Sequence, residues 1–306
     1  MFITVLTQVI ILFILILLGV VLNKTKLLTA TGAKNTTDII LYIVTPCVII
    51  KSFIRDYSAE LFKNLLIGCL ATLLAHILFI IISVLLLKDR NLSKQKVLQF
   101  GTIFSNCGYM AIPLLQAVLG NDGVFYGATY IAVFQVITWS YGIFLMGDGI
   151  KTITPKKILL NPGLIGFVIA FLIFTLQIPV PKIAYEPISY MASLNTPLPM
   201  IIIGYHLANS DIVAGLKDLK LLFASILKLF VLPIIVIFAF YICGLRGTLP
   251  LALSICASAP TAAICTMFAS KFERATSLSA TMVSLTTIFS IISMPLVVTL
   301  AEKLLG

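Results

Sequence analysis

Ser105-Asn106-Cys107-Gly108, followed closely by Pro113, interrupts an apolar stretch of helix length in the first half of the chain. A second interruption, Ala257-Ser258-Ala259-Pro260-Thr261, occurs at the corresponding place in the second half. Each break leaves backbone N–H and C=O groups without helical partners. Within a bilayer such groups are tolerated only where they are buried in protein or line a cavity. The two breaks therefore predict a binding site inside a membrane protein.

The composition places both breaks in a membrane. Of the 306 residues 60% are hydrophobic and only 10% are charged, and the mean hydropathy is +1.14. A membrane-spanning helix needs about 20 apolar residues, and ten segments qualify: 3–23, 36–54, 61–87, 97–120, 123–147, 161–180, 187–208, 219–243, 248–270 and 275–300. We therefore expect an all-α polytopic membrane protein with ten transmembrane helices.

The first segment is expected to be a membrane helix rather than a cleaved signal peptide. No basic residue precedes it and no small-residue cleavage site follows it. The longest linkers, 23–36 and 147–160, leave no room for a soluble catalytic domain.

Basic residues are divided unequally between the two sides of the predicted membrane. Linkers after odd-numbered segments contain fourteen Lys and Arg residues, and the opposite side contains six. Because cytoplasmic loops carry the excess of Lys and Arg, we expect those linkers in the cytoplasm and both termini outside the cell, in a plasma membrane. This orientation accounts for the net charge of +10, and no motif indicates a nucleic-acid partner.

The six cysteines all fall inside apolar segments and show no CxxC spacing. Neither a disulfide framework nor a zinc site is indicated. We expect no metal and no cofactor.

The two halves of the chain also resemble each other. Thr45-Pro46 and Thr196-Pro197 are 151 residues apart, and the same offset carries the first break onto the second. Two five-helix repeats, 1–150 and 151–306, would have opposite orientations because five is odd. Inverted repeats with one broken helix in each are a construction of secondary transporters, which bind substrate near the midplane where the breaks meet. The alternative, that these prolines only kink their helices, stays open for Pro46 and Pro197.

Few ionisable side chains lie inside the predicted segments. All eleven acidic residues fall in linkers or at segment ends, which argues against an antiporter that carries its coupling ion on a buried carboxylate. Lys228 either extends its ammonium to the cytoplasmic face or provides a fixed positive charge near an anion path. His76 is expected to be a hydrogen-bonded packing residue, and Gln135 either faces a cavity or caps one end of the bundle.

An ordered series of motifs extends over residues 16–300. Its main members are Asn106-Cys-Gly-Tyr-Met-Ala-Ile-Pro113, Gly120 and Gln135-Val-Ile-Thr-Trp139. They resemble the fourth and fifth helices of the auxin efflux carrier family. Further similarities are Leu22-Asn-Lys with Pro46, Asn161-Pro162, 197–204, 259–263 and 290–295. In the ninth helix Cys265 replaces a second proline of the family. The short central linker resembles that of prokaryotic members.

This resemblance implies a ten-helix carrier whose broken fourth and ninth helices cross at the substrate site and which works by alternating access. Asn106 would be the site asparagine and Pro113 the crossover proline. Bacterial relatives include permeases for malate and malonate, so the implied substrate is a small carboxylate such as these or an auxin-like acid.

The sequence therefore predicts a secondary transporter for a small organic anion. Half-helix N-termini provide unpaired N–H groups and a partial positive charge for an anion. The predicted substrate-binding residues are Asn106, Cys107, Gly108, Tyr109, Pro113, Gln135, Ser258, Pro260 and Thr261. Pro46 and Pro197 are predicted hinges, and Lys228 is predicted to balance the substrate's charge.

Other functions stay open. A sodium- or proton-coupled symporter of the bile-acid-transporter type would share this architecture. An enzyme is disfavoured because the chain has no HExxH motif and no recognisable catalytic set. Besides the anion and the bilayer, a second copy of the chain is a conceivable partner, because the first helix has no conspicuous polar residue between Gln8 and Asn23.

Overall fold

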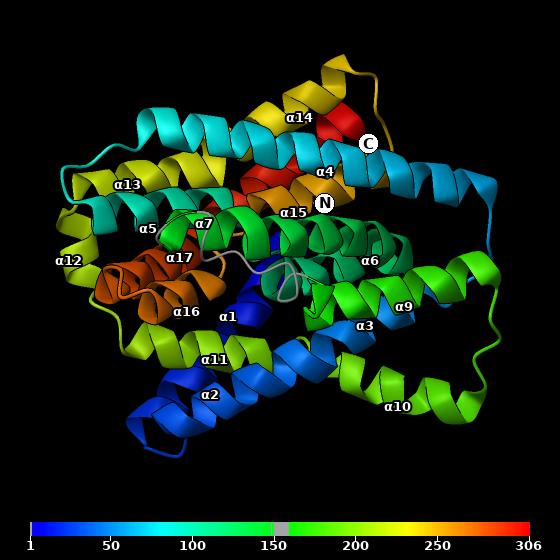
Figure 1. Cartoon of the computed structure of the whole chain (residues 1–306), viewed down its shortest axis with the longest axis horizontal. Coiled ribbons are helices and arrows are strands. Elements are labelled where there is room, and N and C mark those ends of the chain that lie inside the picture. Colours follow the sequence, from blue (N-terminus) through cyan, green and yellow to red (C-terminus); the bar gives the residue numbers. More distant parts are fainter. Residues whose placement is uncertain (1, 148, 150–158) are drawn as a thin grey trace.

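The protein is an all-helical bundle, described here by a computed structural model of residues 2–147, 149 and 159–306 (Figure 1). Most of its helices run along the horizontal axis of Figure 1. Within the described residues there is no β-strand, and the only β-type pairing is an isolated antiparallel bridge between Ser105 and Thr261. The boundary predicted between the two repeats, at 150/151, lies outside the described residues.

The elements comprise α-helices and short π-helical turns, which are written η. In the first half they are α1 (Phe2–Lys24), α2 (Ala30–Ile39), η1 (Ile40–Val44), α3 (Thr45–Phe53), α4 (Ala59–Leu86), α5 (Leu92–Ile103), η2 (Cys107–Ala111), α6 (Ile112–Ile137), η3 (Thr138–Gly142) and α7 (Ile143–Met146). In the second half they are α9 (Pro162–Leu176), α10 (Lys182–Ser193), α11 (Pro197–Ala208), α12 (Ile212–Lys217), α13 (Leu219–Ile226), η5 (Leu227–Val231), α14 (Leu232–Ile242), α15 (Thr248–Ser258), α16 (Ile264–Lys271) and α17 (Thr276–Leu305).

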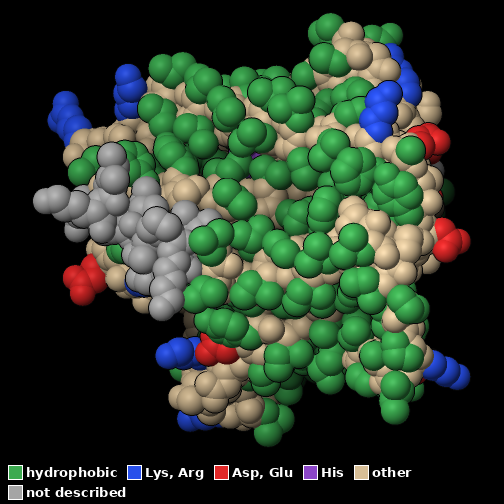
Figure 2. Space-filling model, turned by 45° about the vertical axis from the view of Figure 1, so that its right-hand side comes forward, with side chains coloured by type: hydrophobic (Ala, Val, Ile, Leu, Met, Phe, Trp, Pro, Cys, Tyr) green, Lys and Arg blue, Asp and Glu red, His purple; other side chains and the backbone are tan. Residues whose placement is uncertain are grey.

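Six of the described helical stretches are long and apolar enough to cross a bilayer. They are Phe2–Lys24, Ala30–Phe53, Ala59–Leu86, Cys107–Met146, Leu219–Ile242 and Thr276–Leu305. Figure 2 shows hydrophobic side chains over the broad middle of one face of the molecule, with charged side chains at its margins. A continuous apolar surface of this extent is suited to lipid rather than to water. The predicted all-α membrane fold is confirmed, whereas the count of ten spanning helices and the inverted repeat stay predictions.

Three prolines set the local shape of the helices that contain them. Pro46, Pro113 and Pro233 each stand two residues after the last residue of a π-helical turn, namely η1, η2 and η5. A proline in a helix has no N–H to donate, and its ring clashes with the carbonyl of the fourth residue before it. A π-helical turn before the proline widens the helix and relieves this conflict.

Gly120 divides the longest helical stretch into two arms. Cys107–Met146 has 40 residues, about twice the length needed to span a bilayer. Within it Gly120 has a positive φ of 63°, a conformation that glycine adopts readily because it has no Cβ. The kink agrees with the expected change from one membrane segment to the next at residues 120–123.

Helices α1 and α11 approach each other closely through two glycines. A Cβ added at Gly19 would collide with the carbonyl oxygen of Ile201, and one added at Gly204 would collide with that of Ile16. Small residues at a crossing let membrane helices bring their backbones together. This contact holds α11, which forms part of the candidate site, against the first helix.

Candidate functional site

The two chain breaks meet and pair with each other. Between α5 and η2 the chain leaves the helix at 104–106, and between α15 and α16 it does so at 259–263. The N–H of Asn106 donates to the Pro260 carbonyl (2.7 Å), and the N–H of Ala262 donates to the Phe104 carbonyl (2.9 Å). These two segments are called the crossing below. The backbone groups that each break removes from its own helix thus find partners in the other break, as buried polar groups require.

Side-chain hydrogen bonds of Ser105 and Thr261 also stabilise the crossing. Thr261 donates from Oγ1 to the Gly101 carbonyl (2.8 Å), and its N–H donates to Thr286 Oγ1 (3.2 Å). Ser105 donates from Oγ to the Ala257 carbonyl (3.2 Å). The crossing is therefore joined to α5, α15 and α17 by buried hydrogen bonds.

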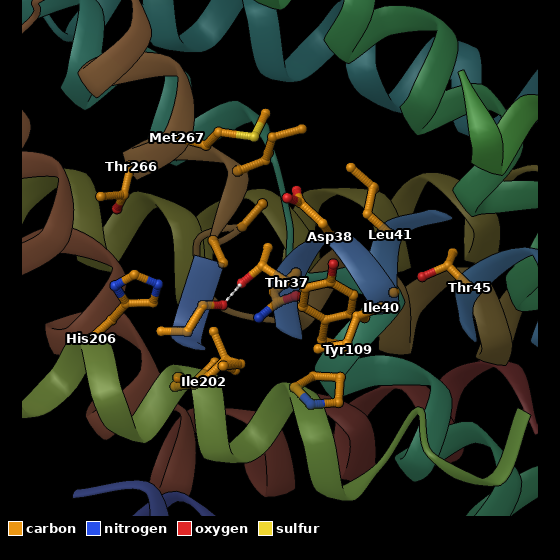
Figure 3. A pocket seen from close by; sticks show the side chains of 18 of the residues that line it. Thr37, Asp38, Ile40, Leu41, Thr45, Tyr109, Ile202, His206, Thr266 and Met267 are labelled. Atoms are coloured by element: carbon orange, nitrogen blue, oxygen red, sulfur yellow. Dashed lines mark hydrogen bonds between the residues drawn. The ribbon is translucent and has the colours of Figure 1, made fainter. Parts of the chain in front are cut away.

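A cavity of about 450 Å³ reaches the crossing from one end of the bundle and is called the first cavity. Its inner end includes Ser105, Asn106 and Cys107, which are buried, and its outer end includes Lys34 and Asp38, which are exposed. Figure 3 shows Ile202 and His206 projecting from α11, Thr266 and Met267 from α16, and Thr37 and Asp38 from α2 around this space. The wall between the two ends is mostly apolar, with Ile40, Leu41, Ile131, Phe134, Ile202, Ile203 and Met267.

Two buried amides in the wall of the first cavity lack hydrogen-bond partners. Asn106 Nδ2 and Gln135 Oε1 are buried, and neither has a partner among the described residues. Leaving such a group unsatisfied costs about 1–3 kcal/mol. An unpaired donor beside an open cavity is therefore suited to bind a ligand that accepts hydrogen bonds.

The backbone beside Asn106 is also open to the first cavity. The first N–H groups of a helix have no partners within it. In η2, which begins directly after Asn106, the N–H of Cys107 donates to the Ser105 carbonyl (2.8 Å) and that of Met110 to the Asn106 carbonyl (3.1 Å). The N–H groups of Gly108 and Tyr109 have no backbone partner among the described residues. A Cβ added at Gly108 would meet no atom within 4 Å. A ligand can therefore approach this helix start closely.

Five of the predicted site residues lie together, and the other four lie elsewhere. Asn106, Cys107, Gly108, Tyr109 and Gln135 lie together in the wall of the first cavity. The others lie elsewhere: Pro260 and Thr261 lie within the crossing, and Ser258 donates to the Ile255 carbonyl (2.9 Å) at the end of α15. Pro113 lines a second cavity.

The second cavity has a volume of about 380 Å³ and is lined by Lys51, Arg55, Pro113 and Asn195, among others. Arg55 forms an ion pair with Asp122, and Lys51 donates to Ser189 Oγ (2.9 Å). This cavity is therefore polar, unlike the middle of the first cavity.

Asn195 connects the two cavities. Its side chain lines the second cavity and donates from Nδ2 to the carbonyl of Gly108 (3.1 Å), which lines the first. Sequence reasoning missed Asn195 as a site residue. The available signal was its position directly before Thr196-Pro197, the pair that repeats Thr45-Pro46.

The outer end of the first cavity was also missed from the sequence. Lys34, Thr37 and His206 all line the first cavity, and none of them is among the predicted site residues. Lys34 falls in the predicted linker 23–36 and Thr37 at the beginning of the predicted segment 36–54, whereas in the structure both belong to α2.

One predicted hinge residue, Pro197, lies at the beginning of a helix, whereas Pro46 lies inside the continuous helical stretch Ala30–Phe53. Pro46 is the second residue of α3 and Pro197 the first of α11. A Cβ added at Gly166 would lie 2.8 Å from Pro46 Cα, so α9 packs directly against this turn. Their role as hinges stays a prediction.

Lys228 is fully buried and its ammonium does not reach a membrane face. It donates hydrogen bonds to Ser105 Oγ and, at 3.4 Å, to the Ala257 carbonyl. The alternative in which this side chain extends to the cytoplasmic surface is therefore wrong. Lys228 also does not belong to the residues that line the first cavity.

His76 is a buried packing residue, as the sequence indicates. Its Nδ1 lies 2.9 Å from the Thr72 carbonyl, and its ring contacts those of Phe79, Tyr130 and Phe134. Within the described residues, no group of three or more His, Cys, Asp or Glu side chains could hold a metal ion.

Comparison with known proteins identifies the family. A family described as membrane transport protein matches residues 4–298. The chain belongs to this family. It is the auxin efflux carrier family, which the sequence motifs around Asn106 and Pro113 resemble.

A relative supports membership of the membrane transport protein family. An uncharacterized transporter of Methanothermobacter thermautotrophicus is 24% identical over 289 residues, which cover 92% of this chain and 94% of the relative. Both the family and the relative are transporters, a class of proteins that are generally not enzymes. The chain is thus a membrane transporter, and its multi-pass character agrees with the composition.

Proposed function

We propose that this transporter carries a small organic anion across the plasma membrane by alternating access. The observation that carries the proposal is the side-chain amide of Asn106: this residue lines the first cavity, and its buried Nδ2 has no partner among the described residues. A carboxylate placed there would satisfy that donor and would also accept from the N–H groups of Gly108 and Tyr109 in the first turn of η2. Hydrogen bonds to a charged group are worth about 1.5–3 kcal/mol each.

The electrostatics of the first cavity favour an anion over a cation. The half-helix that starts at η2 directs its partially positive end toward the inner end of the cavity. The lining residues include one carboxylate, that of Asp38, and it is exposed at the outer end, where Lys34 is also present. A cation at the inner end would therefore meet no acidic partner among the lining residues.

The walls of the first cavity favour an acid that has an apolar body. Between its polar ends the cavity is bounded by side chains such as Ile131, Phe134 and Ile202. A compact dicarboxylate such as malate or malonate would leave these walls without contacts and would offer a second charge that they cannot solvate. An auxin-like monocarboxylate would place its apolar part against them.

Two cavities beside one crossing support alternating access by a ten-helix fold with inverted repeats. The first cavity reaches the crossing at Asn106, and the second includes Ile112 and Pro113 on the following turns. In this proposal the two halves rearrange around the crossing, with hinges at Pro46 and Pro197, and expose the bound anion first through one cavity and then through the other. The excess of basic residues assigns the end that carries Lys34 to the cytoplasm, so the structure would represent an inward-facing state.

Charge movement in proteoliposomes tests this function. The protein is exposed rapidly to malate, malonate or indole-3-acetate, with and without sodium or proton gradients. Saturable entry of negative charge for one acid, independent of sodium, is the expected result. Asn106→Ala is expected to weaken the apparent affinity about tenfold or more, since it removes a hydrogen bond to a charged group.

Asn209→Ala is the matched control, because Asn209 is an exposed asparagine that lines neither cavity. Unchanged transport by folded Asn106→Ala protein would refute the assigned site. Transport that stops without sodium or a proton gradient would instead identify the alternative, a coupled symporter. If no acid moves charge, exchange of radiolabelled acids distinguishes an electroneutral carrier from a carrier of a different substrate class.

A further inference from the structure

Lys228 lies where the carboxyl ends of two half-helices converge. Helix α5 ends at Ile103, two residues before Ser105, and α15 ends at Ser258, directly after Ala257. The Lys228 ammonium donates to Ser105 Oγ and to the Ala257 carbonyl (3.4 Å). It thus contacts one oxygen from each of the two chain breaks.

This position is electrostatically the opposite of the first cavity. The carboxyl end of a helix carries a partial negative charge and its amino end a partial positive charge. The amino ends of η2 and α16, at Cys107 and Ile264, line the first cavity, whereas the carboxyl ends of α5 and α15 lie next to Lys228. The crossing therefore has one side with a partial positive charge, which favours anions, and another with a partial negative charge, which favours cations.

Among the described residues, no acidic partner accounts for the burial of Lys228. The ion pairs of Arg55, Lys94 and Lys220 have no counterpart at Lys228 in this part of the chain. An unpaired ammonium is costly to bury, and here its partners are a hydroxyl oxygen, a carbonyl oxygen and the ring of Phe79, whose centre lies 5.8 Å away. Hydroxyl and carbonyl oxygens at the carboxyl ends of half-helices are the groups with which transporters of this construction bind a coupling cation.

We propose that the Lys228 ammonium is a tethered cation that fills a cation-binding position formed by Ser105 Oγ and the Ala257 carbonyl. The crossing then keeps its two breaks together without a sodium ion. One consequence for transport rests on the proposed function: the carrier would move its anion without sodium coupling. Removal of the Lys228 side chain would leave a position that accepts a small free cation.

Thermal unfolding of the purified protein tests the tethered cation without any need for transport. Wild type, Lys228→Ala and Lys228→Met are compared in sodium, potassium, choline and ethylammonium chloride at equal ionic strength. Wild type is expected to have the same Tm in all four salts. Lys228→Ala is expected to have a lower Tm in choline chloride and to regain about 5 °C, saturably, in sodium or ethylammonium chloride, because a bound ligand stabilises the folded state.

Two variants separate this effect from general salt effects. Lys228→Met fills the space without a charge, so it is expected to be less stable than wild type and to show little response to the small cations. Lys220→Met, at a lysine that is paired with Asp89 at the surface, is expected to show no difference between sodium and choline.

Several outcomes would overturn the proposal. They are a saturable sodium-specific rise in the Tm of wild type, a Lys228→Met protein as stable as wild type, or a Lys228→Ala protein that responds to none of the cations or folds in none of them. These outcomes are independent of the transport assay. The proposal of a tethered cation can therefore be refuted while that of an anion carrier is supported, and the reverse is also possible.

Discussion

The side chain of Asn195 donates a hydrogen bond to the carbonyl oxygen of Gly108, 3.1 Å away, and so joins the beginning of α11 to the first turn of η2. Asn195 is 3% exposed, which means that water cannot easily replace this bond. The contact sets the position of the turn that follows Asn106. The bond also joins the lining of the first cavity to that of the second. A movement that opens one cavity and closes the other would therefore act on this bond.

Asn195→Ala is expected to weaken substrate binding without unfolding the protein. The Gly108 carbonyl would lose a buried donor, at a cost of about 1–2 kcal/mol, and the turn beside Asn106 would become less well positioned. The apparent affinity in the charge-movement assay should fall about 5- to 30-fold. Asn64→Ala is a suitable control, since Asn64 bonds to Tyr126 on α6 (3.4 Å) and lines neither cavity. An equal loss in both variants would show that the effect is not local.

Gly108→Ala is expected to separate stability from transport. The added methyl group would meet no atom within 4 Å, so the Tm should change by no more than about 2 °C. The same methyl group would project into the space where the ligand approaches η2, and the apparent affinity for the transported acid should fall. A variant with normal affinity would indicate that the anion does not bind against this turn.

Gly204→Ala is expected to destabilise the protein. Its methyl group would collide with the backbone of α1 at Ile16 and Gly19, and such overpacking typically costs about 1–3 kcal/mol. A loss of several degrees in Tm should be measurable by thermal unfolding. Gly32→Ala on α2 is the control, because an added Cβ there would lie 3.4 Å from its nearest neighbours and alanine favours the helix. Equal Tm values for the two variants would show that the α1–α11 approach is adaptable.

Acid is expected to loosen the end of the bundle where Asp89 and Asp218 pair with lysines. A hydrogen bond from Lys220 lowers the pKa of Asp89, and for Asp218 the bond from Lys94 (2.6 Å), with backbone N–H donors, outweighs the effect of burial and lowers its pKa too. Because the folded-state pKa values lie below the ordinary 3.8, the stabilisation is present above about pH 4 and is lost as the pH falls through the folded-state values.

The effect appears as a pH dependence of Tm. Between pH 7 and pH 5 these two pairs should contribute no slope, and below about pH 4 the Tm should fall. The double variant with Asp89→Asn and Asp218→Asn should have a slightly lower Tm than wild type at pH 7, and its Tm should fall less steeply in acid. An identical profile for wild type and the double variant would show that the pairs contribute nothing measurable, as is common for exposed ion pairs.

Apolar length and proline placement made the fold predictable to a large extent. The breaks at 105–108 and 257–261 could be located from small and polar residues next to proline, and the structure interrupts the helices at 104–106 and 259–263, within two residues of the predicted bounds. Pro46 and Pro113 indicated local distortion, and each follows a π-helical turn. These signals are local, because a missing N–H and a ring clash act within one helical turn.

The assignment of side chains to the site was less predictable, because it depends on the rotation of each helix and on its neighbours. Asn106 and Gln135 line the first cavity, whereas Thr261 uses its hydroxyl to bond to Gly101. Nothing in the local sequence distinguishes these polar residues. Lys228 shows the same limit, since its position along the helix allowed either the surface or the interior, and only the packing of α5 and α15 around it selects the interior.

The pairing of Phe104 and Asn106 with Pro260 and Ala262 restricts which parts of the protein can travel during a transport cycle. Separating the two breaks would leave four main-chain groups without partners in an interior that holds little water, at about 1–3 kcal/mol for each group. The transport cycle with the lowest free-energy cost keeps these four groups paired and rotates the surrounding helices around them. The backbone of the crossing would then stay nearly fixed, and the substrate would bind next to the part of the molecule that moves least.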